Sequence, residues 1–181
     1  MNPTITSDQL HYLREMGPHV SVLYAEDDPK IRLEMMNYLG KFFPNVVACS
    51  DGEEGLGVYQ KSRFDIVMTD IQMPKMTGIE MLREIKKINP LQEMIITSAY
   101  TESDYFMEAI SLGIDAYILK PVNHAQIIEV LYKTVSKIIQ VRENEEYRYH
   151  LEALVDLKVK SYQSLEEERI ENYANFLCYY I

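Results

Sequence analysis

The stretch VMTDIQMPKMTG, residues Val67–Gly78, decides the fold. It continues a run from Phe64 to Met68 that is apolar at nearly every position, as expected for a strand covered on both faces of a sheet. A charged residue directly after such a strand must lie where the sheet opens to solvent. Asp70 therefore either begins a polar loop or takes part in chemistry at the mouth of a sheet.

Strand-like runs alternate with helix-like runs on both sides of this stretch. Strands are predicted at residues 20–25, 46–49, 64–69, 93–97 and 114–119. Helices are predicted at residues 29–42, 51–61, 79–88 and 102–112, with a fifth from about His124. Such alternation favours a doubly wound α/β fold, a five-stranded parallel sheet with helices on both faces. Ligands of such sheets bind outside the carboxyl ends of the strands, so the strand ends are the informative positions.

The predicted strand ends carry carboxylates, hydroxyls and a lysine. They are Glu26, Asp27 and Asp28, then Asp70, then Thr97 and Ser98, then Lys120 before Pro121. Taken alone, three acids after the first strand are typical of a solvated loop before a helix. Placed beside Asp70 by a parallel sheet, they repel one another unless a cation relieves them, and such oxygen ligands suit Mg²⁺. A hydroxyl and an ammonium group at the same edge would hold a phosphoryl group, which indicates phosphoryl chemistry on a carboxylate.

These motifs resemble the receiver domain of two-component response regulators over about residues 20–141. Glu26-Asp27, the Asp70–Gly78 segment, Ser98-Ala99 and Lys120-Pro121 agree with that family in order, spacing and position at the strand ends. The resemblance implies a flavodoxin-like fold. It also implies that the partner is a sensor histidine kinase or a phosphotransfer protein, which donates a phosphoryl group in an Mg²⁺-dependent reaction.

The resemblance also implies a role for each matching residue. Asp70 would be the phosphoacceptor, with Lys120 facing the phosphate and the Lys120-Pro121 peptide bond in the cis form. The Mg²⁺ ligands would be Glu26, Asp27, Asp70 and the backbone carbonyl of Gln72. The switch residues would be Ser98, whose hydroxyl also assists catalysis, and Tyr117 on the last strand.

Some of these assignments leave alternatives open. Glu26 stands where aspartate is commoner in the family, so its longer side chain would reach the metal directly or through water, and Asp28 competes for the role. Thr97 competes with Ser98, because a slip of one residue turns a strand side chain to the opposite face. Tyr117 would equally suit a half-buried strand aromatic.

Residues outside the receiver-like region form two extensions. Residues 1–18 are predicted to form a helical lead-in with a capping box from Thr6 to Gln9 that stops at Gly17-Pro18, and residues 19–141 the receiver. Residues 142–181 lack proline and glycine and favour a long helix. Its apolar residues recur at three- and four-residue steps, but Lys158, Ser161 and Glu168 interrupt a strict heptad. We expect a coiled-coil homodimer, the alternative being a helix folded back on the receiver.

Composition excludes several classes of function. The formal charge of −10 makes the chain a poor electrostatic match for nucleic acid, so direct binding to DNA or RNA is not expected. The two cysteines have no metal-binding or redox spacing, which is typical of a reducing cytoplasm. No apolar run approaches the roughly 18 residues that a membrane span needs. We therefore expect a cytoplasmic protein that makes no membrane contact.

The sequence favours a signalling switch that takes a phosphoryl group on Asp70 and relays the change through its C-terminal helix. We expect no enzymatic activity beyond phosphorylation and dephosphorylation of Asp70 itself. The alternatives are a receiver-like dimeric scaffold that never turns over phosphate and an Mg²⁺-dependent phosphohydrolase of related fold. The tail loosely resembles linkers between receivers and cyclic-dinucleotide enzymes, including HD-GYP phosphodiesterases, although the chain contains no output active-site motif.

Overall fold

The computed structural model describes residues 5–99 and 103–179 and contains one parallel five-stranded sheet. The strands are β1 (Ser21–Ala25), β2 (Asn45–Cys49), β3 (Ile66–Asp70), β4 (Glu93–Ser98) and β5 (Ala116–Leu119). They lie side by side in the order β2-β1-β3-β4-β5. The helices are α1 (Ser7–Met16), α2 (Pro29–Leu39), α3 (Gly52–Lys61), α4 (Gly78–Ile88), α5 (Ser103–Leu112) and α6 (His124–Tyr179). The predicted doubly wound fold is confirmed.

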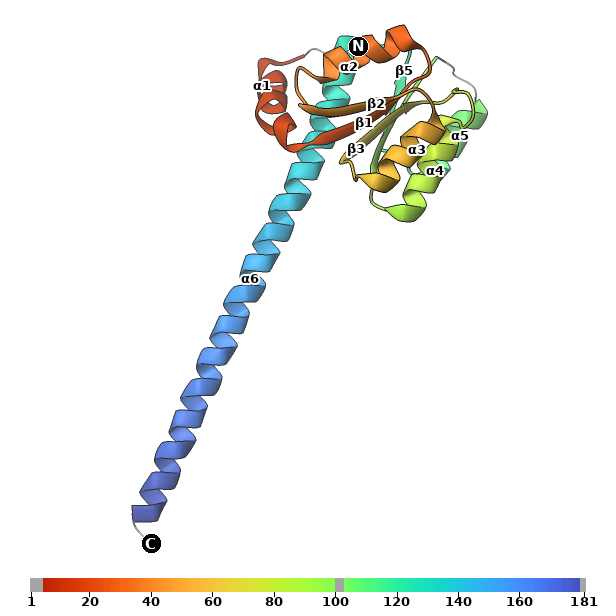
Figure 1. The fold of residues 1–181 in the computed structure, drawn as a ribbon. Coiled ribbons are helices and arrows are strands. Elements are labelled where there is room, and N and C mark those ends of the chain that lie inside the picture. The colour runs from red at the N-terminus through yellow and green to blue at the C-terminus, as the bar shows by residue number, and fades with distance from the viewer. Residues whose placement is uncertain (1–4, 100–102, 180–181) are drawn as a thin grey trace. The chain divides into compact units, whose positions relative to one another are not determined.

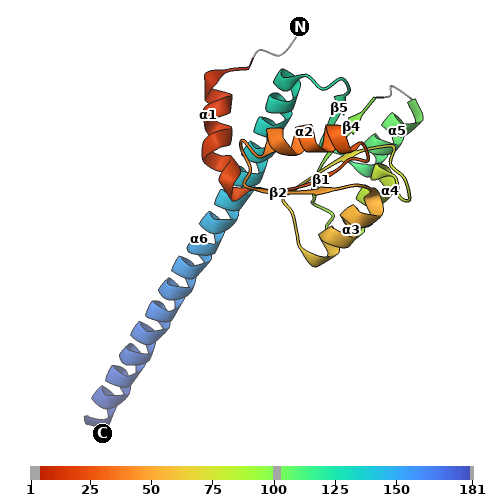
Figure 2. The ribbon, with the colours of Figure 1, turned by 45° about the horizontal axis from the view of Figure 1, so that its top comes forward.

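Helices cover both faces of this sheet. Figures 1 and 2 show α3, α4 and α5 on one face, and α2 with the first turns of α6 on the other. The face below α3 to α5 holds a buried apolar core that includes Leu23, Val67, Leu82, Ile85 and Ile96. Because both faces are covered, the carboxyl edge is where the sheet can expose polar side chains.

The predicted strand around Asp70 differs from the observed one at both ends. β3 begins at Ile66 rather than at Phe64. The Asp65 carboxylate, directly before it, accepts hydrogen bonds from the backbone N–H and the hydroxyl of Ser21, each at 2.8 Å. β3 ends on Asp70 itself, one residue later than predicted. Asp70 therefore belongs to the sheet rather than to the loop that follows.

Side-chain caps fix the helix starts nearest the site. The Asp28 carboxylate accepts hydrogen bonds from the backbone N–H groups of Lys30 and Ile31 and caps α2. Thr77 and Glu80 form a capping box at the start of α4. Such caps satisfy backbone donors that have no partner inside the helix. Both helix starts are thereby held at the carboxyl edge of the sheet.

The N-terminal extension forms α1 followed by a short 3-10 turn, Gly17–His19. The predicted Thr6–Gln9 capping box is confirmed. Leu13 is fully buried, and the Tyr12 ring meets the Tyr132 ring edge-on with 5.3 Å between their centroids. The extension is therefore packed against the receiver core rather than hanging free. Residues 1–4 lie outside the described part of the chain.

The chain divides into two compact units, Met1–Ile138 and Ile139–Ile181. In the second unit the predicted long helix is confirmed as part of α6, and every side chain at residues 140–176 is exposed. Tyr180 and Ile181, at the end of the predicted linker, lie outside the described residues. Among the described residues, no helix is both long and apolar enough to cross a membrane.

Candidate phosphoryl and metal site

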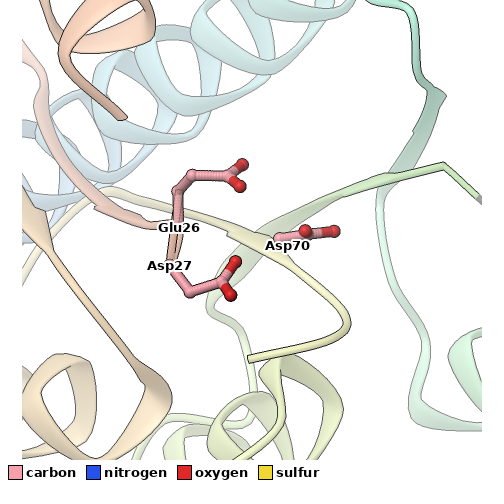
Figure 3. A group of neighbouring side chains, drawn as sticks. All are labelled: Glu26, Asp27 and Asp70. Carbon is pink, nitrogen blue, oxygen red and sulfur yellow. The ribbon is translucent and has the colours of Figure 1, made fainter. Parts of the chain in front are cut away.

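Two adjacent strands, β1 and β3, bring the three candidate acids to one edge of the sheet. Ala25 at the end of β1 pairs with Thr69 on β3, so Glu26 and Asp27 follow directly beside Asp70. Figure 3 shows the three side chains gathered around one space, two from the β1 end and one from the β3 end. One carboxylate oxygen from each residue lies within 4.8 Å of the others. The expected acidic cluster therefore forms.

The burial of these acids is graded. Glu26 is buried, Asp70 is partly buried and Asp27 is exposed. Three hard oxygen ligands with one side open to solvent fit Mg²⁺, which takes few carboxylates and keeps several waters. Asp28, the alternative to Glu26, lies outside the cluster, because the backbone N–H groups of Ile31 and Lys30 engage its carboxylate and lower its pKa. The side chain of Gln72 is exposed in the loop after β3.

Lys120 connects two of the three acids. Its ammonium group donates to Glu26 Oε2 at 2.7 Å and to Asp70 Oδ2 at 3.0 Å. Burial acts to lower the pKa of Lys120, but hydrogen bonds and charge from Glu26 and Asp70 outweigh it and raise that pKa. The lysine therefore stays cationic beside Asp70. The Lys120-Pro121 peptide bond is cis, as the resemblance implied.

The structure separates the two candidate hydroxyls at the end of β4. The Thr97 hydroxyl donates to the backbone carbonyl of Thr69 at 3.3 Å, inside the sheet. Ser98 is the last residue of β4 and is 2% exposed. Neighbouring strand residues point to opposite faces, so only one of the two can face the site. The engagement of Thr97 favours Ser98.

Tyr117 lies in β5, where it pairs in register with Ile96 of β4. Its ring is partly buried and meets the Phe106 ring of α5 edge-on, with 5.7 Å between centroids. This position suits a half-buried strand aromatic, and it also lies on the strand that leads to Lys120. The switch role of Tyr117 stays a prediction.

Sequence reasoning missed one residue that contacts the site. Tyr24, fully buried in β1, donates its hydroxyl to Glu26 Oε2 at 2.9 Å. Burial, and next the Glu26 carboxylate, raise the pKa of Tyr24, so the hydroxyl stays protonated. The signal was present in the sequence, because residues two apart in a strand share a face.

A second missed contact anchors the loop after β3. Lys75 Nζ lies 2.6 Å from Asp51 Oδ2, and the Asp51 side chain is only 3% exposed. Lys75 adopts φ 64°, in the left-handed region that side chains rarely occupy. This ion pair joins the loop to the start of α3, 24 residues away in sequence.

Residues 22–132 match the family described as the response regulator receiver domain. The chain belongs to this family. It is a receiver of two-component signalling, as its motifs predicted. The chemotaxis protein CheY of Thermotoga maritima is 34% identical over 117 residues, which cover 64% of this chain and 97% of that relative.

Two further similar proteins differ in how much of their own length this chain covers. A cyclic di-GMP phosphodiesterase of Thermotoga maritima is 28% identical over 158 residues, 87% of this chain but only 41% of that relative. The crystal structure of the N-terminal domain of an uncharacterized protein from Wolinella succinogenes has a TM-score of 0.63 at 33% identity. It covers 68% of this chain and 98% of the other. The receiver chain thus spans less than half of the phosphodiesterase.

Proposed function

We propose that this receiver is a phosphorylation-driven switch whose phosphoacceptor is Asp70. The observation that carries the proposal is the placement of Lys120, 3.0 Å from Asp70 Oδ2, beside the three gathered carboxylates. A carboxylate held next to a fixed cation is suited to attack a phosphoryl group, because the cation neutralises charge on the transferring oxygens. The phosphoryl donor would be the phosphohistidine of a sensor kinase or of a phosphotransfer protein.

The transfer step follows from the positions of these groups. An Asp70 oxygen forms a bond to phosphorus as the bond from phosphorus to the histidine nitrogen breaks, and the imidazole leaves with its electron pair and takes up a proton. Lys120 and the Ser98 hydroxyl would bind separate oxygens of the transferred group. Glu26, Asp27, Asp70 and the Gln72 carbonyl would hold Mg²⁺, which supplies further charge neutralisation when bound. Phosphoryl transfer of this kind depends mainly on positioning and electrostatics.

The signal would leave through β5 and α6. Ser98 lies at the end of β4, and its backbone carbonyl accepts a hydrogen bond from the Lys120 N–H at 2.7 Å. A movement of Ser98 toward the phosphoryl group would therefore act on the segment that joins β5 to α6. Tyr117, which lies on β5, would rearrange together with Ser98. A switch requires such contacts to differ between two states.

The tail from residue 142 would be the linker of a larger or dimeric protein. The similarity to the cyclic di-GMP phosphodiesterase runs over 158 residues, beyond the receiver match at residues 22–132. This supports a receiver at 19–141 joined by the helical tail to an output domain, and a cyclic-dinucleotide phosphodiesterase is the output that this relative suggests. The exposed apolar residues of the tail support a homodimer through α6.

Intact mass spectrometry tests the proposed chemistry. The protein is incubated with a small phosphodonor such as acetyl phosphate, with and without Mg²⁺, as wild type and as Asp70→Asn. Asp28→Asn is the matched control, since Asp28 caps α2 outside the cluster. We expect a single Mg²⁺-dependent phosphoryl adduct in the wild type and the control. No adduct under any condition would reject the switch and leave the scaffold, and steady release of phosphate from a phosphate ester, which cannot be a by-product of Asp70 phosphorylation by acetyl phosphate, would indicate a phosphohydrolase.

A further inference from the structure

Tyr24 places a polar group in the most enclosed part of the sheet. It lies in β1, which pairs with β2 on one side and β3 on the other, and its side chain is fully buried. A phenol hydroxyl in such a position is costly unless it finds a partner. Its partner is Glu26 Oε2, at 2.9 Å. The Tyr24 hydroxyl is therefore hydrogen-bonded to Glu26, a candidate metal ligand.

Glu26 Oε2 receives two donors at once. The second donor is Lys120 Nζ, at 2.7 Å, and the same ammonium reaches Asp70 Oδ2 at 3.0 Å. Tyr24, Glu26, Lys120 and Asp70 therefore form one continuous chain of hydrogen bonds from the sheet interior to the phosphoacceptor. Glu26 is 1% exposed, so water contributes little to holding its carboxylate.

We propose that Tyr24 is a positioning residue for the metal and phosphoryl site, which acts by holding the Glu26 carboxylate in the acidic cluster. The inference rests on the proposed function, because it assigns Mg²⁺ to that cluster. Residues that hydrogen-bond a metal ligand orient it and commonly decide the affinity of the site. Tyr24 supplies a buried neutral donor to the Glu26 side chain, whereas the donor from Lys120 is charged.

The length of the Glu26 side chain explains why a fixed hydrogen-bond donor beside it matters. Glutamate has one more rotatable bond than aspartate, so its carboxylate has more positions to choose from. Lys120 divides its ammonium hydrogen bonds between Glu26 and Asp70, so it does not serve Glu26 alone. The Tyr24 ring is rigid and enclosed by the sheet, so its hydroxyl provides a fixed point. Tyr24 thereby offsets the use of a longer acid at this position.

Tyr59 offers a matched control within the same chain. It is also fully buried, and its hydroxyl also donates to a side chain, Gln92 Oε1, at 2.6 Å. Gln92 donates in turn to the backbone carbonyl of Asp65, which precedes β3 at the opposite edge of the sheet. Tyr59→Phe therefore removes a similar buried hydrogen bond without touching the acidic cluster.

The test measures Mg²⁺ affinity of the unphosphorylated full chain by titration with MgCl₂, followed by NMR. We expect Tyr24→Phe to weaken Mg²⁺ binding by about tenfold, the low end for loss of a residue that supports a metal ligand. Tyr59→Phe should bind as the wild type does. Glu26→Asp withdraws the carboxylate from the phenol, so Tyr24→Phe in that background should cause little further loss. Folding of each variant is checked by thermal unfolding.

The outcomes separate this inference from the proposed function. If the wild type binds Mg²⁺ and forms the adduct, while Tyr24→Phe binds Mg²⁺ equally well, the positioning role is wrong and the switch stands. An equal loss in Tyr24→Phe and Tyr59→Phe would assign Tyr24 a structural role only. A wild type that neither binds Mg²⁺ nor forms an adduct would overturn both proposals.

Discussion

Lys120 and Asp70 meet across the end of β4, with 3.0 Å between Nζ and Oδ2. Asp70 closes β3 and Lys120 follows β5, so the lysine reaches over the strand that separates them. Both side chains are 14% exposed, which limits screening of the pair by water. The arrangement places a cation where charge would develop on a phosphoryl group bonded to Asp70.

We expect Lys120→Met to slow phosphorylation of Asp70 by about 10²- to 10³-fold, the usual loss when one fixed charge-stabilising donor is removed. The rate is measured by a time course of intact mass at saturating phosphodonor and Mg²⁺. Lys133→Met is the control, because Lys133 pairs with Glu129 on the exposed face of α6. A Lys120→Met rate equal to that of the control would show that this ammonium takes no part in transfer.

Gly78 is required by the close approach of α4 to the end of β3. A Cβ at this position would collide with the backbone oxygen of Asp70 and would lie 2.8 Å from Thr69 Oγ1. We expect Gly78→Ala to destabilise the fold by about 1–3 kcal/mol, the range for overpacking. It should also lower the yield of phosphoryl adduct, because the displaced backbone belongs to Asp70. Thermal unfolding and intact mass measure the two effects.

Gly57→Ala is the matched control for this substitution. Gly57 lies inside α3, and a Cβ there would meet nothing within 4 Å. Alanine at an open helix position should stabilise the fold by about 0.5–1 kcal/mol. If the two variants were destabilised alike, steric contact at Gly78 would not be the cause.

The sequence predicted the fold well because its strand ends are chemically distinct. Apolar runs located all five strands, and the polar residues after them located the edge at which Glu26, Asp27, Asp70 and Lys120 gather. Local pattern could not show how these side chains pair. The Lys75–Asp51 ion pair joins residues 24 positions apart, and such a contact depends on the packing of α3 against the loop.

Ambiguities in the sequence had physical causes that the structure makes visible. Thr97 and Ser98 are both hydroxyl residues on one strand, and the hydrogen bond that directs the Thr97 hydroxyl to the Thr69 carbonyl inside the sheet is visible only in the structure. The sequence pattern alone assigns Tyr24 to the core, because an aromatic residue in an apolar strand is typical of a core position. Its hydroxyl has significance only through the carboxylate two residues later. The sequence shows which residue types are present, but not which side chains form hydrogen bonds with one another.

Glu93 is the first residue of β4, at the edge of the sheet opposite the acidic cluster. It should make the stability of the fold depend on pH. Its side chain is 12% exposed, Oε1 lies 2.7 Å from Lys137 Nζ, and Oε2 is buried without a hydrogen-bond partner among the described residues. Burial raises the pKa of Glu93; the Lys137 ammonium lowers it only in part, and the Asp115 carboxylate raises it again. The folded state therefore holds this proton more tightly than the unfolded state does.

The sign of the effect follows from that difference. A raised carboxyl pKa contributes stability that is fully present below the ordinary value of 4.5 and is lost as pH rises through the folded-state pKa. The stability of the wild type, compared with that of Glu93→Gln, should therefore fall as pH rises from about 4 toward neutrality, the range in which a glutamate with a raised pKa loses its proton. Melting temperatures across this range measure it, with Glu129→Gln as a control for loss of one surface charge. If the difference in melting temperature between the wild type and Glu93→Gln did not change with pH, the raised pKa of Glu93 would be wrong.

The tail should associate through one face of α6. Leu151, Leu154 and Leu165 fall at the two inner positions of a heptad pattern, whereas Leu157 lies outside that seam. Leu154 and Leu157 are 62% and 65% exposed, so they form a matched pair that differs only in position around the helix. A dimer would bury Leu154 twice, at about 1.5–3 kcal/mol each.

Leu154→Lys should therefore raise the dissociation constant of the dimer by at least about a hundredfold, since 1.4 kcal/mol is a factor of ten. Leu157→Lys adds the same charge at nearly the same exposure and should have little effect. Sedimentation velocity over a dilution series measures both variants against the wild type. If the wild type is a monomer at every concentration, phosphorylated or not, α6 does not mediate homodimerisation. If Leu157→Lys dissociates the dimer as strongly as Leu154→Lys, the pairing face is not the predicted one.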